Sequence, residues 1–290
     1  MTALNQQTKR IAAIHDISGF GKCSLTIALP VISASGVECA CIPTALLSTH
    51  TAIRGFRIQD LSSEIVPIAK HWHDLGVHFD GIYSGYLASP EQAELLETVI
   101  AELKEEHTQV IIDPVMADEG VYYSKLDDRM CQAFRRLCAS ADVITPNITE
   151  AALLVGIPYE AAPHRPEYIQ QLMDGLSKLC SGVIALTGVH PSAKEVGVAA
   201  MNVATGEVKL HTNPIQDGVF YGTGDIFASA LAALLVRGVE MDTALDLALD
   251  LVNRSICRTA CSDAPREYGV DFEAVLPDYI LEVRKHCSQQ

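Results

Sequence analysis

Short apolar runs alternate with longer amphipathic segments along most of the chain, and this alternation restricts the fold more than any other feature. The apolar runs are rich in β-branched residues and are bounded by glycine or polar residues, which is typical of buried strands. Strands that alternate with helices form mostly parallel sheets, which need helices on both faces. Strands are predicted at residues 11–15, 38–43, 81–84, 110–113, 143–145 and 183–187.

The segments between these strands carry apolar residues at helical spacing. Ala93, Leu96 and Ile100, for example, fall on one face of a helix. Helices are predicted at residues 24–35, 61–75, 90–105, 126–138, 167–179, 223–236, 243–260 and 272–285.

One antiparallel pair is predicted at residues 196–202 and 207–211, with Ala204-Thr205-Gly206 as the turn. No internal repeat, low-complexity segment or linker interrupts the pattern, so we expect a single domain over residues 1–290. The predicted fold class is α/β, with three α/β/α layers around a mostly parallel central sheet.

The charge of the chain argues against nucleic acid as a partner. Its 36 acidic and 21 basic residues give a net charge of −15, and no basic run is present. Such a protein can still bind an anionic nucleotide through metal ions, main-chain amides and helix N-termini.

The apolar and cysteine content indicates the compartment. Residues 1–10 are polar and contain no apolar secretory segment. The apolar runs are shorter than the roughly 20 residues that span a bilayer. The nine cysteines include no C-x-x-C pair, which favours reduced thiols. We therefore expect a cytoplasmic protein with no membrane contact.

Polar residues follow the predicted strands at the points where the strands end. In open α/β sheets, ligands bind beyond the carboxyl ends of the strands. We expect this edge to gather Asp16, Ser18, Thr44, Gly85, Tyr86, Asp113, Asn147 and Thr187.

The sequence Gly222-Thr223-Gly224-Asp225 leads into an apolar helix and carries the clearest chemical signal. Its glycines allow close approach of a ligand and expose amides at the helix N-terminus, which suits a phosphoryl group in transfer. Asp225 would then accept a proton from a substrate hydroxyl. Alternatively, Asp225 is only a favourable acidic residue at a helix start.

The loop Gly19-Phe20-Gly21-Lys22-Cys23-Ser24 superficially resembles a P-loop but departs from it twice. The pattern G-x-x-x-x-G-K-[ST] requires Gly where Asp16 stands, and Ser or Thr where Cys23 stands. We interpret the loop as part of a substrate pocket, with Lys22 either near the phosphates or in solvent.

Three motifs together identify a resemblance to a family. The run from Gly222 to Phe227 resembles the signature of the ribokinase-like superfamily. Asp113-Pro114-Val115-Met116, followed by Asp118, resembles the D-P-V-M segment of its vitamin-kinase branch. Thr145-Pro146-Asn147-Ile148-Thr149-Glu150 resembles the T-P-N-x-x-E segment of that branch. The motifs occur in the family's order, so a ribokinase-like fold is expected.

Within that branch, the similarity is greatest to pyridoxal and pyridoxamine kinases. The stretch from Ser84 to Gln92 resembles their G-Y-[IL]-x-S-x-E-Q segment, and Ser48-Thr49-His50-Thr51 resembles their S-N-H-T segment. Asp16 stands where many of these kinases have serine. The sequences around Asp16 and Thr44 are similar to hydroxymethylpyrimidine kinases, so the ring substrate stays open.

The resemblance implies ATP-dependent phosphorylation of the 5′-hydroxymethyl group of a B6 vitamer: pyridoxamine, pyridoxal or pyridoxine. It implies Mg²⁺ as a cofactor, a homodimer, and room for a monovalent cation such as K⁺ near Asp113. The resemblance implies that Asp225 is the catalytic base and that Gly222, Thr223 and Gly224 form the anion hole and contact the nucleotide. It implies further nucleotide contacts for Asn147 and Thr187, and metal binding for Asp113, Asp118 and Glu150. The implied substrate-binding residues are Asp16, Ser18, Thr44, His50 and Tyr86.

Structural roles explain several of these residues as well. Asn147 and Thr149 could cap a helix, since both residue types are good caps. His50 could be a histidine with a structural role only, and Tyr86 could pack in the core. Two other functions also stay open. The protein could phosphorylate hydroxymethylpyrimidine, or it could be a vitamer-binding protein without catalysis.

Overall fold

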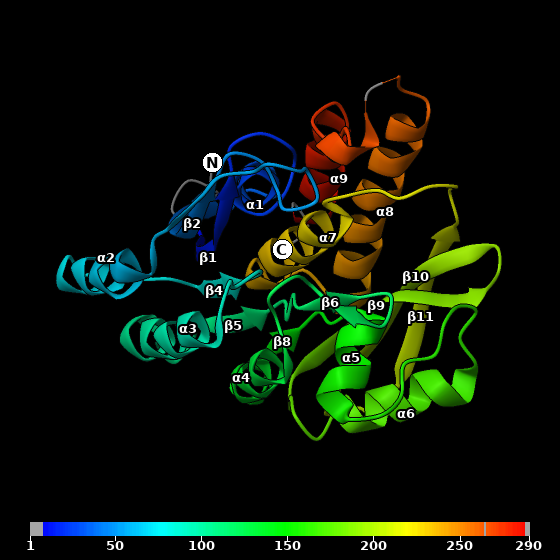
Figure 1. Ribbon diagram of the computed structural model, residues 1–290, viewed down its shortest axis with the longest axis horizontal. Helices are drawn as coiled ribbons and strands as arrows, with labels where there is room; N and C mark the ends of the chain where they lie inside the picture. Colours follow the sequence, from blue (N-terminus) through cyan, green and yellow to red (C-terminus); the bar gives the residue numbers. More distant parts are fainter. Residues whose placement is uncertain (1–7, 264, 288–290) are drawn as a thin grey trace.

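A nine-stranded sheet runs through the centre of the protein, whose computed structural model describes residues 8–263 and 265–287 (Figure 1). The strand order is β11-β10-β9-β8-β5-β4-β1-β2-β3. The six strands from β9 to β2 are parallel, and β3, β10 and β11 are antiparallel to their neighbours. Its strands are β1 (Arg10–Ser18), β2 (Glu38–Leu47), β3 (Ile58–Asp60), β4 (Gly81–Ser84), β5 (Gln109–Ile112), β8 (Val143–Ile144), β9 (Val183–Ser192), β10 (Glu195–Asn202) and β11 (Val208–Pro214).

Helices cover both faces of this sheet, and a small hairpin lies beside it. The hairpin consists of β6 (Ala117–Asp118) and β7 (Val121–Tyr122). The helices are α1 (Leu25–Ala34), α2 (Ser62–Asp74), α3 (Pro90–Leu103), α4 (Asp128–Ala139), α5 (Ile148–Val155), α6 (Pro166–Leu176), α7 (Thr223–Val236), α8 (Met241–Ala260) and α9 (Leu276–Cys287), with a 3₁₀ turn η1 at Arg266–Tyr268.

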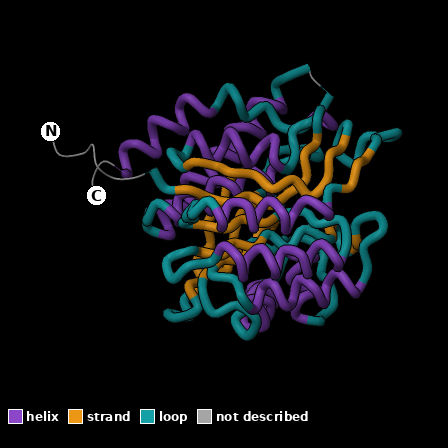
Figure 2. The backbone as a smooth tube through the Cα atoms, turned by 90° about the vertical axis from the view of Figure 1, so that its left-hand side faces the viewer, coloured by secondary structure: helices purple, strands orange, loops and turns teal. Residues whose placement is uncertain are grey.

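The two faces of the sheet bury separate apolar clusters. In β1, Ala12 and Ile14 belong to one cluster, and Ile11 and Ala13 belong to the other, as strand alternation requires. The first cluster includes residues of α2 to α6, and the second includes residues of α1, α7, α8 and α9. Figure 2 shows the strands between these helical layers. The α/β fold class is therefore confirmed.

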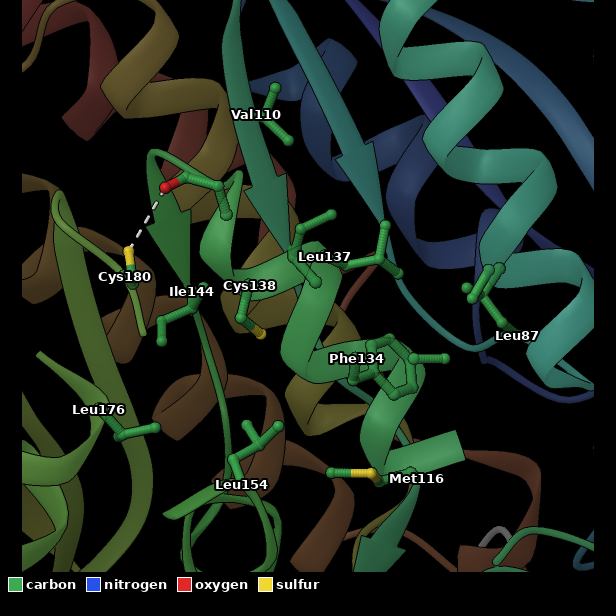
Figure 3. Packing of buried hydrophobic residues seen from close by; sticks show 14 of the residues in the cluster. Leu87, Val110, Met116, Phe134, Leu137, Cys138, Ile144, Leu154, Leu176 and Cys180 are labelled. Carbon is green, nitrogen blue, oxygen red and sulfur yellow. Dashed lines mark hydrogen bonds between the residues drawn. The ribbon is translucent and has the colours of Figure 1, made fainter. Parts of the chain in front are cut away.

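Cysteines contribute to the first cluster as apolar side chains. Cys138 is fully buried with Phe134 and Leu137 on α4, and the Cys180 thiol donates to the Ala141 carbonyl at 3.4 Å (Figure 3). All nine cysteines are free. The predicted unpaired thiols are thus confirmed.

Most predicted elements are present, and the differences are local. The sequence prediction missed the short helix α5 and the strands β3, β6 and β7. The last helix begins at Leu276 instead of residue 272, because residues 272–275 form a turn and Pro277 suits a first helical turn. In the described part of the chain, no helix combines the length and apolarity of a membrane span. The single domain stays a prediction.

Candidate active site

The predicted site residues lie where the parallel strands end. Asp16 and Ser18 close β1, Thr44 is on β2, and Asp113 directly follows β5. Because parallel strands share one direction, their carboxyl ends meet at a single edge of the sheet. The N-terminus of α7 approaches this edge because Asp225 hydrogen-bonds to His15 on β1 and to the Ser24 amide in the following loop.

The turn before α7 requires glycine at its first position. Gly222 has φ +84°, and a Cβ there would lie 2.5 Å from the Lys22 carbonyl oxygen and 2.6 Å from Ile27 Cδ1. A Cβ at Gly224 would meet no atom within 4 Å. No side chain caps the first amides of α7. The turn therefore leaves open space beside a helix N-terminus, which favours a negatively charged ligand.

Both oxygens of the Asp225 carboxylate are held in place. Oδ1 lies 3.1 Å from His15 Nε2, and Oδ2 accepts from the Ser24 amide at 2.9 Å. Burial favours a higher pKa for Asp225, but the hydrogen bond and positive charge of His15 outweigh it and lower the pKa below its usual value. Asp225 is therefore ionised and oriented before any ligand binds.

His15 was not among the predicted site residues, and it lies between two carboxylates. Its Nδ1 is 3.0 Å from Asp16 Oδ1, opposite the contact with Asp225. Burial tends to lower the pKa of His15, but its hydrogen bonds to the carboxylates of Asp16 and Asp225, and their negative charges, raise it to about 10. Asp16, predicted to bind substrate, uses one side-chain oxygen for the contact with His15. The pairing of β1 with β2 shifts register at Asp16, between His15 and Ile17.

Asp113 and Glu150 form a second buried acidic group. Burial and the charge of Asp225 raise the pKa of Asp113 to about 7, and burial and Asp113 raise that of Glu150 well above its usual value. Glu150 accepts from the amides of Met116 at 3.0 Å and Asn147 at 2.8 Å. Two such carboxylates are ionised together only when a positive charge lies nearby.

This donor set fits Mg²⁺, which takes one or two carboxylates and completes its shell with water and phosphate oxygens. Asp118, the third predicted ligand, is exposed on β6, and its Oδ1 accepts from the Glu119 amide. Across the described residues, no group of three side chains forms a ready-made metal cage. Water and nucleotide oxygens would therefore supply much of the coordination.

Two predicted nucleotide-binding residues, Asn147 at the N-cap of α5 and Thr187 on β9, are engaged with the main chain. Asn147 caps α5 through the Glu150 amide at 2.9 Å and donates to the Ala117 carbonyl at 2.8 Å. The Thr187 hydroxyl donates to the Pro146 carbonyl at 3.3 Å. These contacts position the loop after β8 and leave direct nucleotide contact as a prediction.

The predicted substrate-binding residues differ in their engagement. Ser18 and Thr44 are buried, and their hydroxyls lack a hydrogen-bond partner among the described residues, which is costly unless a ligand or water pairs with them. His50 Nε2 lies 2.5 Å from the Glu267 carbonyl oxygen, and its ring is 5.2 Å from that of Tyr221. Tyr86 is partly buried, and its pKa is raised by burial and by Asp16.

Lys22, in the glycine-rich first loop, is paired with two carboxylates. Lys22 Nζ lies 2.6 Å from Glu273 and 3.7 Å from Asp271. Separately, a hollow of about 750 Å³ is lined by α5 and α6 residues such as Val155 and Gln170, none of which belongs to the predicted site.

The chain matches the family model for phosphomethylpyrimidine kinase over residues 28–265. A pyridoxine/pyridoxal/pyridoxamine kinase of Bordetella avium is 26% identical over 258 residues, which are 84% of this chain and 83% of the relative. A Bacteroides thetaiotaomicron structure described as a phosphomethylpyrimidine kinase, in a crystal form with pyridoxal, is 34% identical with a TM-score of 0.89, covering 94% of this chain and 96% of that one.

Two pyridoxal kinase structures are also similar. The enzyme of Lactobacillus plantarum is 30% identical, with a TM-score of 0.87 and coverage of 97% and 99% of the two chains. The enzyme of Leishmania donovani, in complex with ADP and pyridoxamine, is 19% identical, with a TM-score of 0.84 and coverage of 93% and 95%.

The fold and these matches define a kinase with the ribokinase-like architecture, as the motifs indicated. Within that class, the chain belongs to the phosphomethylpyrimidine kinase family, which is the family of the pyridoxal kinases. It is a phosphotransferase of the pyridoxal kinase type, with an alcohol group as acceptor.

Proposed function

We propose that the protein transfers the terminal phosphoryl group of MgATP to the 5′-hydroxymethyl group of a B6 vitamer. The observation that carries this proposal is the Asp225 carboxylate, which is ionised and fixed beside the uncapped amides of α7. A base in that position could take the proton of an alcohol that attacks a phosphate bound at the helix N-terminus. The pyridoxal and ADP named for the similar structures support the choice of substrate and donor.

In this mechanism, Asp225 orients the substrate hydroxyl and takes its proton. The hydroxyl oxygen forms a bond to the terminal phosphorus while the bond to the bridging oxygen of the nucleotide breaks, and ADP leaves. The amides of Gly222, Thr223 and Gly224 would stabilise the charge on the transferred group. Asp113 and Glu150, with Asp118 acting through water, would hold Mg²⁺, which supplies positive charge to the phosphates.

The remaining site residues would bind the two substrates. Ser18 and Thr44 offer unpaired hydroxyls to the polar groups of the vitamer, and His50 and Tyr86 would line its ring. Asn147 and Thr187 would shape the loop against which the nucleotide lies. A monovalent cation near Asp113 is compatible with the raised pKa of that carboxyl.

The decisive experiment replaces the base. We expect Asp225→Asn to lower kcat by about 10²- to 10⁴-fold, measured as ADP release with MgATP and pyridoxamine, pyridoxal or pyridoxine. Vitamer binding, measured by calorimetry, should persist. Asp250→Asn, which changes an exposed aspartate on α8, is the matched control and should keep full activity. Near-normal turnover by Asp225→Asn would reject the mechanism.

Hydroxymethylpyrimidine is the second candidate substrate, because the matching family model is that of phosphomethylpyrimidine kinase. The values of kcat/KM for hydroxymethylpyrimidine and the three vitamers would decide between the substrates. Tight vitamer binding without ATP consumption would instead indicate a binding protein.

We also propose that the protein is a cytoplasmic homodimer. The resemblance to pyridoxal kinases supports the homodimer, and Leu46, which is 48% exposed beside the edge strand β3, is a candidate interface residue. Sedimentation of the wild type and of a Leu46→Lys variant would test it, since a monomeric wild type contradicts the proposal.

A further inference from the structure

We infer that His15 is a positioning residue for the reaction, acting as a buried cation that holds the Asp225 carboxylate in its ionised, oriented form. The inference rests on the proposed role of Asp225 as the base. No motif contains His15, because it lies at the end of an apolar strand, 210 positions before Asp225.

Both nitrogens of the His15 ring face a carboxylate oxygen. Nδ1 is 3.0 Å from Asp16, and Nε2 is 3.1 Å from Asp225. A neutral imidazole can donate from only one nitrogen, and the protonated ring donates from both. The amides of Asp16 and Tyr86 also donate to these nitrogens, at 3.0 and 3.3 Å, which suits a nitrogen without a proton, so the hydrogen-bond geometry alone does not fix the protonation state.

The surrounding charges decide in favour of the protonated ring. The His15 side chain is 1% exposed, Asp16 is 5% exposed and Asp225 is 13% exposed, so water screens these charges little. A neutral ring would leave two buried carboxylates without a cation.

The other titratable groups around this pair add no positive charge. Asp113, which follows β5, is an acidic residue and raises the negative potential at Asp225. The Tyr83 ring on β4 lies edge-on to the His15 ring, with centroids 6.4 Å apart. The Cys23 thiol, before α1, contacts Asp225, and burial and Asp225 raise its pKa. His15 is therefore the local cation for this part of the site.

Glycine at position 85 makes the space that the ring occupies. A Cβ at Gly85 would lie 2.1 Å from His15 Nε2, closer than any real contact. The backbone at Gly85 therefore packs closely against the His15 ring, and the hydrogen bonds to Asp16 and Asp225 restrain the orientation of the ring.

This arrangement has two consequences for catalysis. First, His15 restrains Oδ1 of Asp225 while the Ser24 amide restrains Oδ2, so the remaining lone pairs point in fixed directions toward a hydroxyl. Second, the cation offsets negative charge that would otherwise repel an incoming phosphate. A loose transition state needs orientation more than strong basicity, so the low pKa of Asp225 does not oppose the reaction.

The test replaces His15 by Gln, which can donate one hydrogen bond and carries no charge. We expect His15→Gln to lower kcat by about 10- to 100-fold with little change in the KM for ATP or vitamer, because orientation is lost and binding is kept. Removal of the cation raises the pKa of Asp225, so the acidic limb of the kcat–pH profile should move to higher pH.

The matched control is His164→Gln, which changes another buried histidine. His164 is 5% exposed, and it accepts from the His190 amide, outside the site. Its kcat and pH profile should equal those of the wild type. A shared loss of kcat in both variants would mean a general structural effect and would overturn the inference.

A spectroscopic measurement separates this inference from the proposed function. In ¹⁵N spectra of the wild type at pH 8, the His15 ring should be protonated, and in Asp225→Asn it should lose its proton at lower pH. A neutral ring at pH 8, or a His15→Gln variant with wild-type kcat and pH profile, would overturn the inference alone. A wild type that consumes no ATP with any vitamer would overturn the proposed function and the inference together.

Discussion

Two groups of buried carboxylates lie at the same edge of the sheet, and their charges are balanced in different ways. Asp16 and Asp225 share His15, and the pKa of Asp225 is lowered. Asp113 and Glu150 form no ion pair with a basic side chain of the described residues, and both pKa values are raised. The two groups are therefore prepared for different partners.

The difference indicates where each positive charge comes from. The negative charge of Asp225, the proposed base, is offset by a residue of the chain itself, so this carboxylate is oriented before substrate binds. The second group must take its positive charge from outside, and Mg²⁺ arriving with the nucleotide would supply it. One region is preorganised, and the other is completed by its ligand.

The largest effect is expected when the packing of His15 is disturbed in the first region, which contains Asp16 and Asp225. Gly85→Ala places a methyl group against His15 and should displace the ring from Asp225, lowering kcat by about 10²-fold. Steady-state ADP release measures this. Gly206→Ala, in the turn between β10 and β11, is the control for a glycine substitution and should keep its kcat. Full activity in Gly85→Ala would mean that the position of His15 does not matter.

The second region should respond to metal. With nucleotide present, saturating Mg²⁺ should stabilise the wild type by up to about 2.7 kcal/mol at a hundredfold excess over Kd, and EDTA should reverse this. Thermal unfolding measures the gain. Asp113→Asn should lose most of it, whereas His15→Gln should retain it. An equal loss in both variants would show that the two regions are not separate.

The pH dependence of stability should distinguish the first region. The pKa of His15 is raised to about 10 in the folded protein. The stabilisation that protonated His15 gives the folded protein is therefore complete below about pH 6.5, the pKa of histidine in the unfolded chain. It is lost as the pH rises toward 10. We expect the wild type to lose about 3 to 4 kcal/mol more than His15→Gln between pH 7 and 10, measured by urea unfolding. Parallel curves for the two proteins would contradict this.

The smallest effect concerns the loop that carries Glu150. Asn147→Ala removes the cap of α5 and should lower the free energy of unfolding by about 1 kcal/mol. Asn147→Asp keeps the cap oxygen but loses the bond to Ala117, so it should recover most of the loss. If the KM for ATP rises in both variants while stability differs, Asn147 also contacts the nucleotide.

Much of the fold could be predicted because its signals are local. Strand alternation, the helical faces and the turn at Gly222 all lie within short windows of sequence, and the rule for parallel sheets then gathers Asp16, Asp113 and Asn147 at one edge. Helix α5 was missed because its eight residues are too few to show a clear helical period.

The part that could not be predicted depends on contacts between distant segments. His15 occupies an apolar strand, and only the docking of α7 reveals its role. In the same way, the function of Gly85 becomes visible only when a side chain from another strand fills the space beside it. The Glu150 oxygens were predicted to bind metal, and their bonds to two main-chain amides could be found only in three dimensions.

The order of elements along the chain has a consequence for biosynthesis. Every strand ends by Pro214, whereas α7, α8 and α9, which cover most of one face of the sheet, come afterwards. A nascent chain thus completes its sheet while one face still lacks three of its four helices. A protein truncated after residue 215 would expose that apolar face and aggregate, and it would also lack the proposed base. Helix α7 therefore brings part of the cover of the sheet and the Asp225 carboxylate to the fold together.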